Sequence, residues 1–594
     1  MIHSPRPAHS PRNRFHRPPL TGPKRPPESR PVPPLAPGNI RIITLGGVEE
    51  IGKNMTAIEY EGDIIVIDAG LEFAGDEAPG VDYIIPDISY LEANKEKIRA
   101  VLVSHGHLDH IGGIPFVMPR IDNPIIYTRN LTSLMIKKRH EEFPHLPKLN
   151  INIVEKADKI RAGKLTIRFF GVTHTIPDSM GIAIETPYGL IVTPGDYKLE
   201  QEDGIPSARE EENYKMFDRE KTLLLLCDST NVENPGFSTP EKLVHKGLDE
   251  LIKNTHGRLI IGTFASQFER MIKIIELVEK YGRRLVVEGR SMKTNIDVAL
   301  TANMLKIKKD TIIPTTDIDR YPEDKIVVLA TGAQGEEFAA LMRMATGNHK
   351  NFKFKRGDTV ILSSSIIPGN EKTVQKLKDN IARQGAKIIH YRTSETYIHS
   401  SGHGNREEIA WLHRKIKPKF FVPIHGHHYM LRVHAELAME LGLSEKNIVI
   451  PDNGSVIEIS DIGQKIAALK ETAAHRVVMV DGLGNSNVEE VVIRDRQMLA
   501  QDGMFVIIAL IDVASGKIRK SPDIISRGFI YLKESQDLLR QVRLLTKKKI
   551  EESTAQMHPI NFDYVKNAVR DEIGRYLYQK THKRPIVLPV LIEV

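Results

Sequence analysis

The chain of 594 residues contains only one cysteine and one tryptophan. A single cysteine, Cys227, cannot form an internal disulfide, which excludes a disulfide-stabilised secreted scaffold and favours a reducing cytoplasm. Long apolar runs are also missing. The longest, Met504–Ile511, is far shorter than the ~20 residues that span a bilayer, and the first residues lack the apolar segment of a signal peptide. We therefore expect a cytoplasmic protein with no membrane segment.

Positive charge is concentrated at the N-terminal end. The formal net charge is +7, and residues 1–40 contain seven Lys and Arg against one Glu. The rest of the chain is therefore close to neutral. A proline-rich tail of this composition cannot bury apolar surface, so we expect residues 1–39 to be disordered. Such a tail is either a loose tether for a polyanion or an extension with no binding task.

The most informative stretch is 104–113, which reads Ser-His-Gly-His-Leu-Asp-His-Ile-Gly-Gly. The apolar run before it predicts a buried strand, and alternation along the chain puts His105 and His107 on one side. A helix that begins after them would project Asp109 and His110 from its first turn. These ligands suit a pair of divalent ions better than one ion in a closed cage. A polar loop whose histidines only form hydrogen bonds is the alternative, which this spacing disfavours.

This stretch resembles the signature of the metallo-β-lactamase superfamily, and further motifs of that superfamily occur in the expected order. Asp68 ends a strand-like apolar run, where the superfamily keeps an aspartate that orients the site. His174 lies in Gly-Val-Thr-His-Thr-Ile-Pro-Asp, and Asp196 lies in Thr-Pro-Gly-Asp after another apolar run. Each motif is weak alone, because an Asp after a strand is usually a turn or cap residue. Their common order makes the set specific.

Residues 258–391 alternate between strand-like and helical segments, which predicts parallel βαβ units. Ligand motifs resume after this block, with His403 in 399–404 and His425 after an apolar strand. If Asp196 and His425 share one site, an autonomous unit has been inserted between them. The glycine-rich turn 46–55 lacks the spacing of a nucleotide-binding loop, so we interpret it as a hairpin beside the metal site.

A C-terminal portion follows a stretch of weak periodicity. Strands are expected at 476–480, 491–493, 505–512 and 586–592, and helices around 535–549 and 562–579. This pattern predicts a small α/β module for dimerisation or substrate guidance.

Together these features resemble the β-CASP branch of nucleic-acid-cutting metallohydrolases, and within it the ribonuclease J family. The stretches that carry this resemblance are 45–55, 263–266, 331–336, 367–371, 399–404, 526–531 and 584–590. One departure is His427-His428, where many relatives have an acidic residue and then an aromatic one.

The resemblance implies an α/β fold: a metallo-β-lactamase αββα sandwich interrupted by an inserted parallel β-CASP domain, plus a small α/β C-terminal domain. The expected boundaries are a tail at 1–39, the sandwich at 40–225 and 393–462, the β-CASP domain at 226–392, a linker at 463–475 and the C-terminal domain at 476–594.

The resemblance also implies a ligand set for two divalent metal ions per subunit. His105, His107 and His174 would bind one ion, Asp109, His110 and His425 the other, with Asp196 bridging them and Asp68 orienting ligands from behind. Zn²⁺ is the first choice because imidazole and carboxylate both suit it, and Mn²⁺ and Mg²⁺ are the alternatives.

The chemistry implied is two-metal hydrolysis of RNA, in which His403, held by Asp228, protonates the leaving ribose oxygen. Substrate phosphate would be bound by His399, Ser401, Gly402, His403 and Ser365. For Ser363, Ser364 and Ser365, ordinary polarity at the end of a strand is a better explanation than phosphate binding. The expected substrate is single-stranded RNA with a 5′-monophosphate, degraded 5′ to 3′ and also cut internally, in rRNA processing, RNA maturation and mRNA decay. We expect a homodimer or homotetramer with RNA-decay or ribosome partners.

Three alternatives stay open at this point. A small-molecule hydrolase of the same superfamily would need no inserted domain. A nucleic-acid-binding scaffold with an inactive site would have no need for all seven ligands. A DNA-directed β-CASP nuclease differs only in contacts to the 2′-hydroxyl, which a sequence does not display.

Overall fold

The computed structural model describes residues 31–594 except 76–77, 338, 368, 481–489, 532–534, 556 and 558. Most of the predicted tail, residues 1–30, lies outside the described part. Residues 31–39 do make contacts with the folded chain: Val32 packs against a buried cluster, and the Pro33 carbonyl accepts a hydrogen bond from Arg41 Nη2 at 2.7 Å. These contacts concern the end of the tail, and the disorder expected for the tail stays a prediction.

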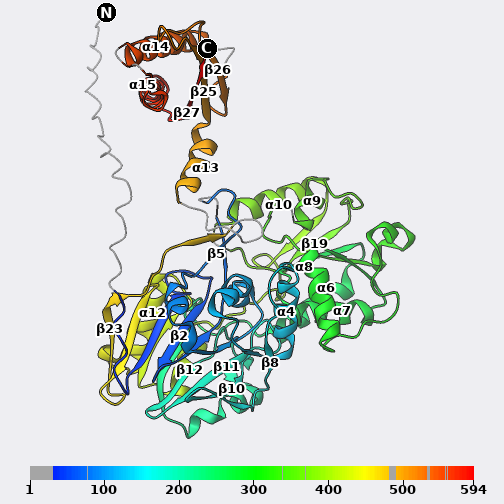
Figure 1. Cartoon of the computed structure of the whole chain (residues 1–594). Helices are drawn as coiled ribbons and strands as arrows, with labels where there is room; N and C mark the ends of the chain where they lie inside the picture. The colour runs from blue at the N-terminus through cyan, green and yellow to red at the C-terminus, as the bar shows by residue number, and fades with distance from the viewer. Residues whose placement is uncertain are drawn as a thin grey trace, which may run out of the picture.

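Two β-sheets face each other in the larger body of the chain (Figure 1). The first sheet has eight strands, in the order β23 (Lys465–Thr472), β22 (Ser455–Ser460), β1 (Ile40–Gly46), β2 (Met55–Tyr60), β3 (Asp63–Ile67), β6 (Ile98–Leu102), β7 (Ile126–Thr128) and β8 (Ile151–Ile153). The second has six, in the order β21 (Phe420–Ile424), β15 (Thr222–Asp228), β12 (Gly189–Thr193), β11 (Met180–Thr186), β10 (Leu165–Gly171) and β9 (Lys159–Ala162). β1 and β2 pair antiparallel, as the predicted hairpin requires.

The core of this body lies between the two sheets. One buried cluster contains Ile42 and Ile65 from the first sheet together with Ile182 and Leu224 from the second. Strands such as β3 are buried along their whole length because their side chains are apolar on both faces. The outer faces must therefore be covered as well.

Helices cover both outer faces. Ile114 of α3 (Ile114–Val117) and Ile136 of α4 (Asn130–His140) pack on the first sheet. Leu412 of α11 (Arg406–Ile416) and Leu437 of α12 (His428–Glu440) pack on the second. The result is the predicted αββα sandwich. The shorter elements are α1 (Ser89–Ala93), α2 (Leu108–Ile111), α5 (Ala208–Asn213), β13 (Gln201–Glu202) and β14 (Ile205–Pro206).

An inserted domain interrupts the second sheet. Its own sheet is parallel, in the order β17 (Arg284–Glu288), β18 (Ile326–Ala330), β16 (Leu259–Gly262), β19 (Thr359–Leu362) and β20 (Lys387–His390). Helices α6 (Glu241–Asn254), α7 (Phe268–Lys280) and α8 (Arg290–Thr301) share one buried cluster with it, and α9 (Ala340–Ala345) and α10 (Glu371–Arg383) share another. The insertion leaves from β15 and returns at β21, which are parallel neighbours with Asp228 opposite Ile424.

The C-terminal domain is a three-stranded sheet in the order β26 (Asp523–Arg527), β25 (Met504–Ile511) and β27 (Ile586–Glu593), with α14 (Gln536–Thr554) and α15 (Phe562–Thr581) packed on it. The strand predicted at 491–493 is wrong, because these residues belong to helix α13 (Glu490–Asp502). Only Ile493 of that short apolar run is buried. A run of three apolar residues does not distinguish a strand from a helix.

The structure also places a strand in the predicted linker 463–475. β23 pairs with β22 at the edge of the first sheet, and its burial follows no simple alternation. After it, β24 (Val478–Val480) joins β5 (Tyr83–Ile85) and β4 (Glu72–Phe73) in a small sheet.

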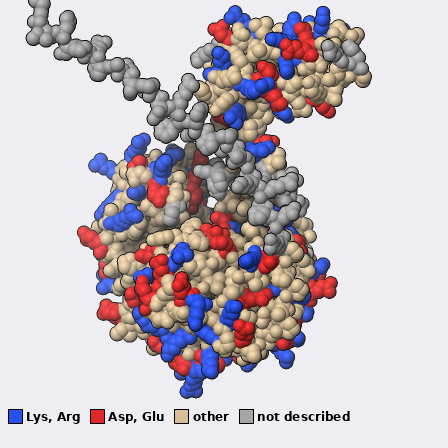
Figure 2. Space-filling view, turned by 90° about the vertical axis from the view of Figure 1, so that its left-hand side faces the viewer, with Lys and Arg blue, Asp and Glu red and all other residues tan. Residues whose placement is uncertain are grey.

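Charged side chains of both signs are interspersed over the face drawn in Figure 2. Within the described residues, no helix combines the length and the apolar character that a membrane crossing needs.

Candidate active site

Asp68 and Ser104 form the frame of the site at the ends of the parallel strands β3 and β6. Asp68 Oδ1 accepts a hydrogen bond from the Ser104 amide at 2.8 Å, and Asp68 Oδ2 accepts one from the Ser104 hydroxyl at 2.9 Å. The same oxygen lies 2.8 Å from His110 Nδ1. The chain then turns into the short helix α2, which carries Asp109 and His110 as predicted.

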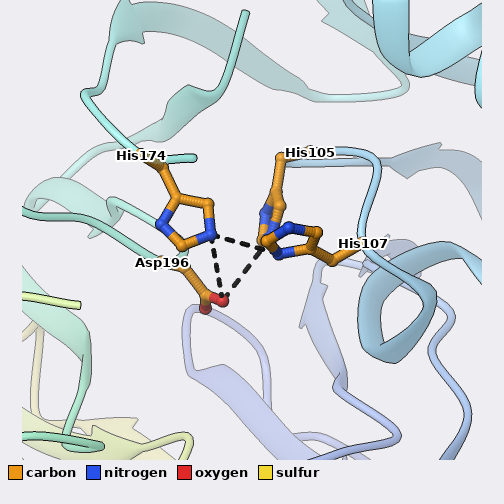
Figure 3. A group of neighbouring side chains, drawn as sticks. All are labelled: His105, His107, His174 and Asp196. Atoms are coloured by element: carbon orange, nitrogen blue, oxygen red, sulfur yellow. Dashed lines mark hydrogen bonds and ion pairs between the residues drawn. The ribbon is translucent and has the colours of Figure 1, made fainter. Parts of the chain in front are cut away.

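Four donor atoms converge in a first group, which Figure 3 shows. His107 Nδ1 lies 3.0 Å from His105 Nε2 and 3.1 Å from His174 Nε2. Asp196 Oδ2 lies 3.5 Å from His105 Nε2 and 3.8 Å from His174 Nε2. Tetrahedral ligands about 2.1 Å from one ion lie about 3.4 Å from each other. The spacing of these four atoms therefore fits a single divalent ion.

A second group shares Asp196 with the first. His110 Nε2 lies 3.2 Å from Asp196 Oδ1 and 3.4 Å from Asp109 Oδ2. His425 Nε2 lies 3.2 Å from Asp109 Oδ2 and 3.8 Å from Asp196 Oδ1. Asp196 thus directs one carboxylate oxygen at each group, which is the geometry of a bridging ligand. The structure brings together all seven residues predicted as ligands.

The second nitrogen of each imidazole has its own partner. His105 Nδ1 contacts the Ser104 hydroxyl at 3.0 Å, and His107 Nε2 contacts the Thr175 hydroxyl at 3.0 Å. His174 Nδ1 donates to the Gly402 carbonyl at 2.7 Å. Such partners fix the ring orientation and the tautomer of a metal-binding histidine.

The second ring nitrogen of His425 also has partners, and these lie just after and at the end of strand β15. Its Nδ1 lies 2.8 Å from the Thr230 hydroxyl and 3.3 Å from Asp228 Oδ1. Its backbone has a φ of 51°, in the left-handed region that histidine reaches more often than most residues. The turn that follows β21 therefore aims this ring at the site.

The protonation states of the imidazoles differ between the two donor groups. Burial lowers the pKa of His105, His107 and His174, which leaves their ring nitrogens neutral. Burial alone would raise the pKa of Asp109 and Asp196, but the combined charges of His110 and His425, with their hydrogen bonds, lower both values. Burial would lower the pKa of His110 and His425, but the same carboxylates raise it, so a divalent ion must displace a proton from each of these two rings. Neutral imidazoles and ionised carboxylates are the forms that bind divalent cations.

The surroundings of one carboxylate oxygen of Asp196 show whether these residues fit a cation. Asp196 Oδ1 is buried and has no hydrogen-bond partner in the part of the chain that the structure describes. Its neighbours are His110 Nε2 at 3.2 Å and His425 Nε2 at 3.8 Å. A buried carboxylate oxygen that receives no hydrogen bond would be stabilised by a cation between it and these rings. The surrounding imidazoles and carboxylates are ligands of borderline metals such as Zn²⁺.

His403 and Asp228 lie beside the two donor groups. His403 Nδ1 is 2.7 Å from Asp228 Oδ2, and its Nε2 is 4.0 Å from Asp196 Oδ2. Burial would lower the pKa of His403, but the charges of Asp228 and Asp196 raise it. Asp228 Oδ1 in turn accepts hydrogen bonds from the amide and hydroxyl of Thr230, at 2.9 and 2.6 Å.

The residues predicted to bind phosphate lie on two loops. Ser401 Oγ accepts hydrogen bonds from the His403 amide at 3.2 Å and from Asn231 Nδ2 at 2.9 Å. His399 lies two residues earlier on this loop. Ser365 follows β19 on the other loop, where Gln334 Nε2 donates to its carbonyl at 2.6 Å. A hydrogen bond of 2.6 Å from the Ser363 hydroxyl to the Ile398 carbonyl joins the two loops.

Several residues of the site were not found from the sequence. Ser104, Thr175 and Thr230 orient ligands through hydroxyl groups, and each stands next to or near a predicted site residue in the sequence, which is a usable signal. Asn54 Nδ2 lies 3.2 Å from His110 Nε2 and donates to the Asp109 carbonyl at 3.2 Å. Its glycine-rich turn was placed beside the site, but no pattern identified the asparagine.

Four family models match successive parts of the chain. The metallo-beta-lactamase superfamily matches residues 48–226, and the ribonuclease J beta-CASP domain matches 256–381. The "Zn-dependent metallo-hydrolase RNA specificity domain" matches 389–451, and the ribonuclease J C-terminal domain matches 491–594.

Relatives match over nearly the whole chain. "Ribonuclease J 1" of Streptococcus pyogenes is 36% identical over 94% of this chain and 98% of its own length. "Ribonuclease J2" of Bacillus subtilis is 33% identical, over 94% and 99%. A crystal structure of a protein of unknown function from Enterococcus faecalis shares the fold, with a TM-score of 0.50, 18% identity, and coverage of 71% of this chain and 100% of that one. The chain therefore belongs to the ribonuclease J family of metal-dependent ribonucleases.

Proposed function

We propose that this ribonuclease degrades single-stranded RNA from a 5′-monophosphorylated end and also cuts internally, in RNA maturation and mRNA decay. The observation that carries the proposal is the pair of donor groups that share Asp196, with His403 beside them. Two adjacent cation sites and a nearby imidazole provide what hydrolysis of a phosphodiester needs.

We infer two divalent ions per subunit, with Zn²⁺ preferred over Mn²⁺ and Mg²⁺ because most ligands are imidazoles. When bound, such ions lower the pKa of a water molecule and neutralise charge on phosphate oxygens. The chain's own part is to hold seven donor groups in place through the hydrogen bonds described above, with Asp68 and Thr230 acting behind the ligands.

His403 supplies the proton in this proposal. Its Nδ1 is hydrogen-bonded to Asp228, so its Nε2 faces the donor groups and can give a proton to the leaving ribose oxygen. The carboxylate of Asp228 stabilises the protonated ring before transfer. The proton lost from His403 neutralises the alkoxide, which leaves a 3′-hydroxyl on one product and a phosphate on the other.

The loops that carry His399, Ser401, Gly402 and Ser365 bind the 5′-terminal phosphate in the proposal. Backbone amides in a compact glycine-containing turn bind anions well. A phosphate held there would place the first nucleotide next to His403, which lies on the same loop. This arrangement favours release of mononucleotides.

The inserted domain decides against a small-molecule hydrolase, because a compact substrate would not need a second domain beside the metal site. A DNA-directed nuclease is the remaining alternative and is an outcome of the test below. The homodimeric or homotetrameric assembly, the cytoplasmic location and the RNA-decay or ribosome partners stay predictions.

The test compares matched RNAs with a 5′-monophosphate, a 5′-triphosphate or a 5′-hydroxyl, plus a DNA control of the same sequence. Products are resolved over time in the presence of Zn²⁺, Mn²⁺ or Mg²⁺. We expect mononucleotides to appear first from the monophosphorylated RNA. Internal fragments alone would refute the exonuclease part, and equal cleavage of DNA would refute RNA selectivity.

His403→Ala tests the proton donor. We expect metal content close to that of the parent protein and a loss of cleavage rate of about 10²- to 10⁴-fold, the usual contribution of a positioned general acid. Asp228→Asn should show the same direction, since it weakens the support of the ring. An unchanged rate for His403→Ala would remove this residue from the reaction.

A further inference from the structure

A buried charged cluster lies behind His399. Arg270 of α7 donates to both carboxylate oxygens of Glu241 of α6, at 2.8 and 2.9 Å. Lys198, two residues after Asp196, lies 3.3 Å from Glu241 Oε2. All three side chains are buried, and that of Arg270 is fully so. Two cations and one anion leave this hydrogen-bonded cluster with one excess positive charge.

Arg270 contacts both loops of the proposed phosphate site. Its Nη1 lies 3.3 Å from the Ser363 carbonyl, and its Nη2 donates to the Ser400 carbonyl at 3.2 Å. A guanidinium with this many buried partners is held in a single orientation. The same side chain therefore fixes the relative position of the loop after β19 and the loop at 399–403.

The contact with His399 has a chemical consequence. Arg270 Nη1 lies 3.0 Å from His399 Nδ1. A guanidinium can only donate, so Nδ1 must accept and the ring proton must lie on Nε2. Burial and then the charge of Arg270 lower the pKa of His399 to about 3, which keeps the ring neutral at physiological pH.

The Nε2–H group of His399 lacks a hydrogen-bond acceptor in the described part of the chain. His399 Nε2 is buried and has no hydrogen-bond partner among the described residues. A buried donor without an acceptor is destabilising. A phosphate oxygen of the bound substrate would provide the acceptor that this Nε2–H group lacks.

We propose that Arg270, held by Glu241, is a positioning residue that makes His399 an Nε2–H donor for the 5′-terminal phosphate of RNA. This inference rests on the proposed function, which places that phosphate at His399. It adds a residue from the inserted domain that touches no substrate and yet sets preference for the 5′ end. A plain structural ion pair would have no such effect.

The test uses Arg270→Met, in which Glu241 keeps Lys198 as its partner, and also the triple variant Arg270→Met/Glu241→Gln/Lys198→Met, which removes every charge of the buried cluster together. The control is Arg258→Met/Asp358→Asn. Arg258 and Asp358 form a buried pair of the same kind in the same domain, with hydrogen bonds of 2.8 and 2.6 Å. The control therefore reports the general effect of losing a buried ion pair.

Two readouts are measured on each variant. The first is the ratio of kcat/KM for 5′-monophosphorylated over 5′-hydroxyl RNA, with KM and kcat separated. The second is the ¹⁵N spectrum of labelled histidines, in which the His399 signals are assigned by their loss in His399→Gln. We expect the ratio to fall roughly tenfold through a higher KM in the Arg270 variants, consistent with a lost charge-assisted contact. The His399 signals should lose the pure Nε2–H pattern, and the control should change neither readout.

The outcomes separate the two claims. If the parent protein shows no preference for a 5′-monophosphate, the phosphate site of the proposed function is wrong, and this inference falls with it. If the parent prefers the monophosphate and His399→Gln abolishes that preference while the Arg270 variants keep it, only the role of Arg270 is refuted. An unchanged His399 tautomer in folded Arg270→Met would refute it independently of any activity.

Discussion

Gly402→Ala should weaken metal binding without altering a single proposed ligand. A Cβ atom at residue 402 would lie 2.7 Å from His174 Cε1 and 2.8 Å from Thr175 Cγ2. Carbon atoms in contact lie about 3.5 Å apart or more, so the His174 ring must move by about 0.8 Å. Metal–ligand distances tolerate only about ±0.2 Å. The same methyl group also disturbs the Gly402 carbonyl that accepts the His174 Nδ1 proton.

We expect the affinity for the ion of the first donor group to fall by about 10- to 100-fold, the range seen when the partner of a metal ligand is disturbed. The assay is metal content after dialysis against a graded chelator series, with thermal unfolding of the metal-free protein as a check on folding. Gly404→Ala is the matched control, because the three atoms nearest to its added Cβ belong to Glu408 and Tyr197, with Glu408 Cβ at 3.0 Å, and none belongs to a proposed metal ligand. Equal chelator resistance in Gly402→Ala and the parent would refute the steric argument.

Two further substitutions test the surroundings of the site. Thr230→Val removes the hydroxyl that contacts Asp228 Oδ1 and His425 Nδ1. The affinity for the ion of the second donor group should therefore fall about 10- to 100-fold, whereas Thr230→Ser should keep the parental affinity. A valine variant with the metal content of the parent protein would contradict this. Glu241→Gln should make the free energy of unfolding less dependent on pH at acidic pH. Burial opposes ionisation of Glu241, but Arg270 and Lys198 lower its pKa to about 2, so the unfolded chain binds the proton first and stability is lost as pH falls from about 4.5 towards 2. The parent should lose about 3 kcal/mol of unfolding free energy more than the variant over that window, measured by denaturant titration at each pH, and parallel profiles would contradict the assignment.

The sequence predicts the layers of this fold well where a pattern extends over many residues. Continuous apolar runs such as β15 and β21 are recognisable because both faces of those strands are buried. The apolar pattern does not identify an element where only one face of it is buried or where the apolar run is only a few residues long. β23 is an edge strand with a mostly exposed face, and the apolar residues at the start of α13 are largely exposed, with only Ile493 buried. In both places the local sequence does not distinguish the element from its neighbours.

For the site, residues whose chemistry is rare at a given spacing could be predicted. Three histidines and an aspartate within six positions have few structural uses. His174, Asp196 and His425 are assigned only through the resemblance to the metallo-β-lactamase superfamily and its β-CASP branch. Residues that act through common chemistry could not be predicted. An arginine in an amphipathic helix such as α7 is ordinary in sequence, and only the fold shows that Arg270 is buried against His399. Tertiary contacts across 129 positions leave no local pattern.

The place of the insertion explains how two tasks share one site. The inserted domain joins the sandwich between β15 and β21. Asp228 is the last residue of β15, and His425 directly follows β21. One loop then connects the two tasks: His399 contacts Arg270 of the inserted domain, and the Gly402 carbonyl accepts a hydrogen bond from the proposed metal ligand His174. Three peptide units span at most about 11 Å. The proposed phosphate site at one end of this loop and the proposed hydrolytic centre at the other are thus held close together, as the proposed removal of single terminal nucleotides requires.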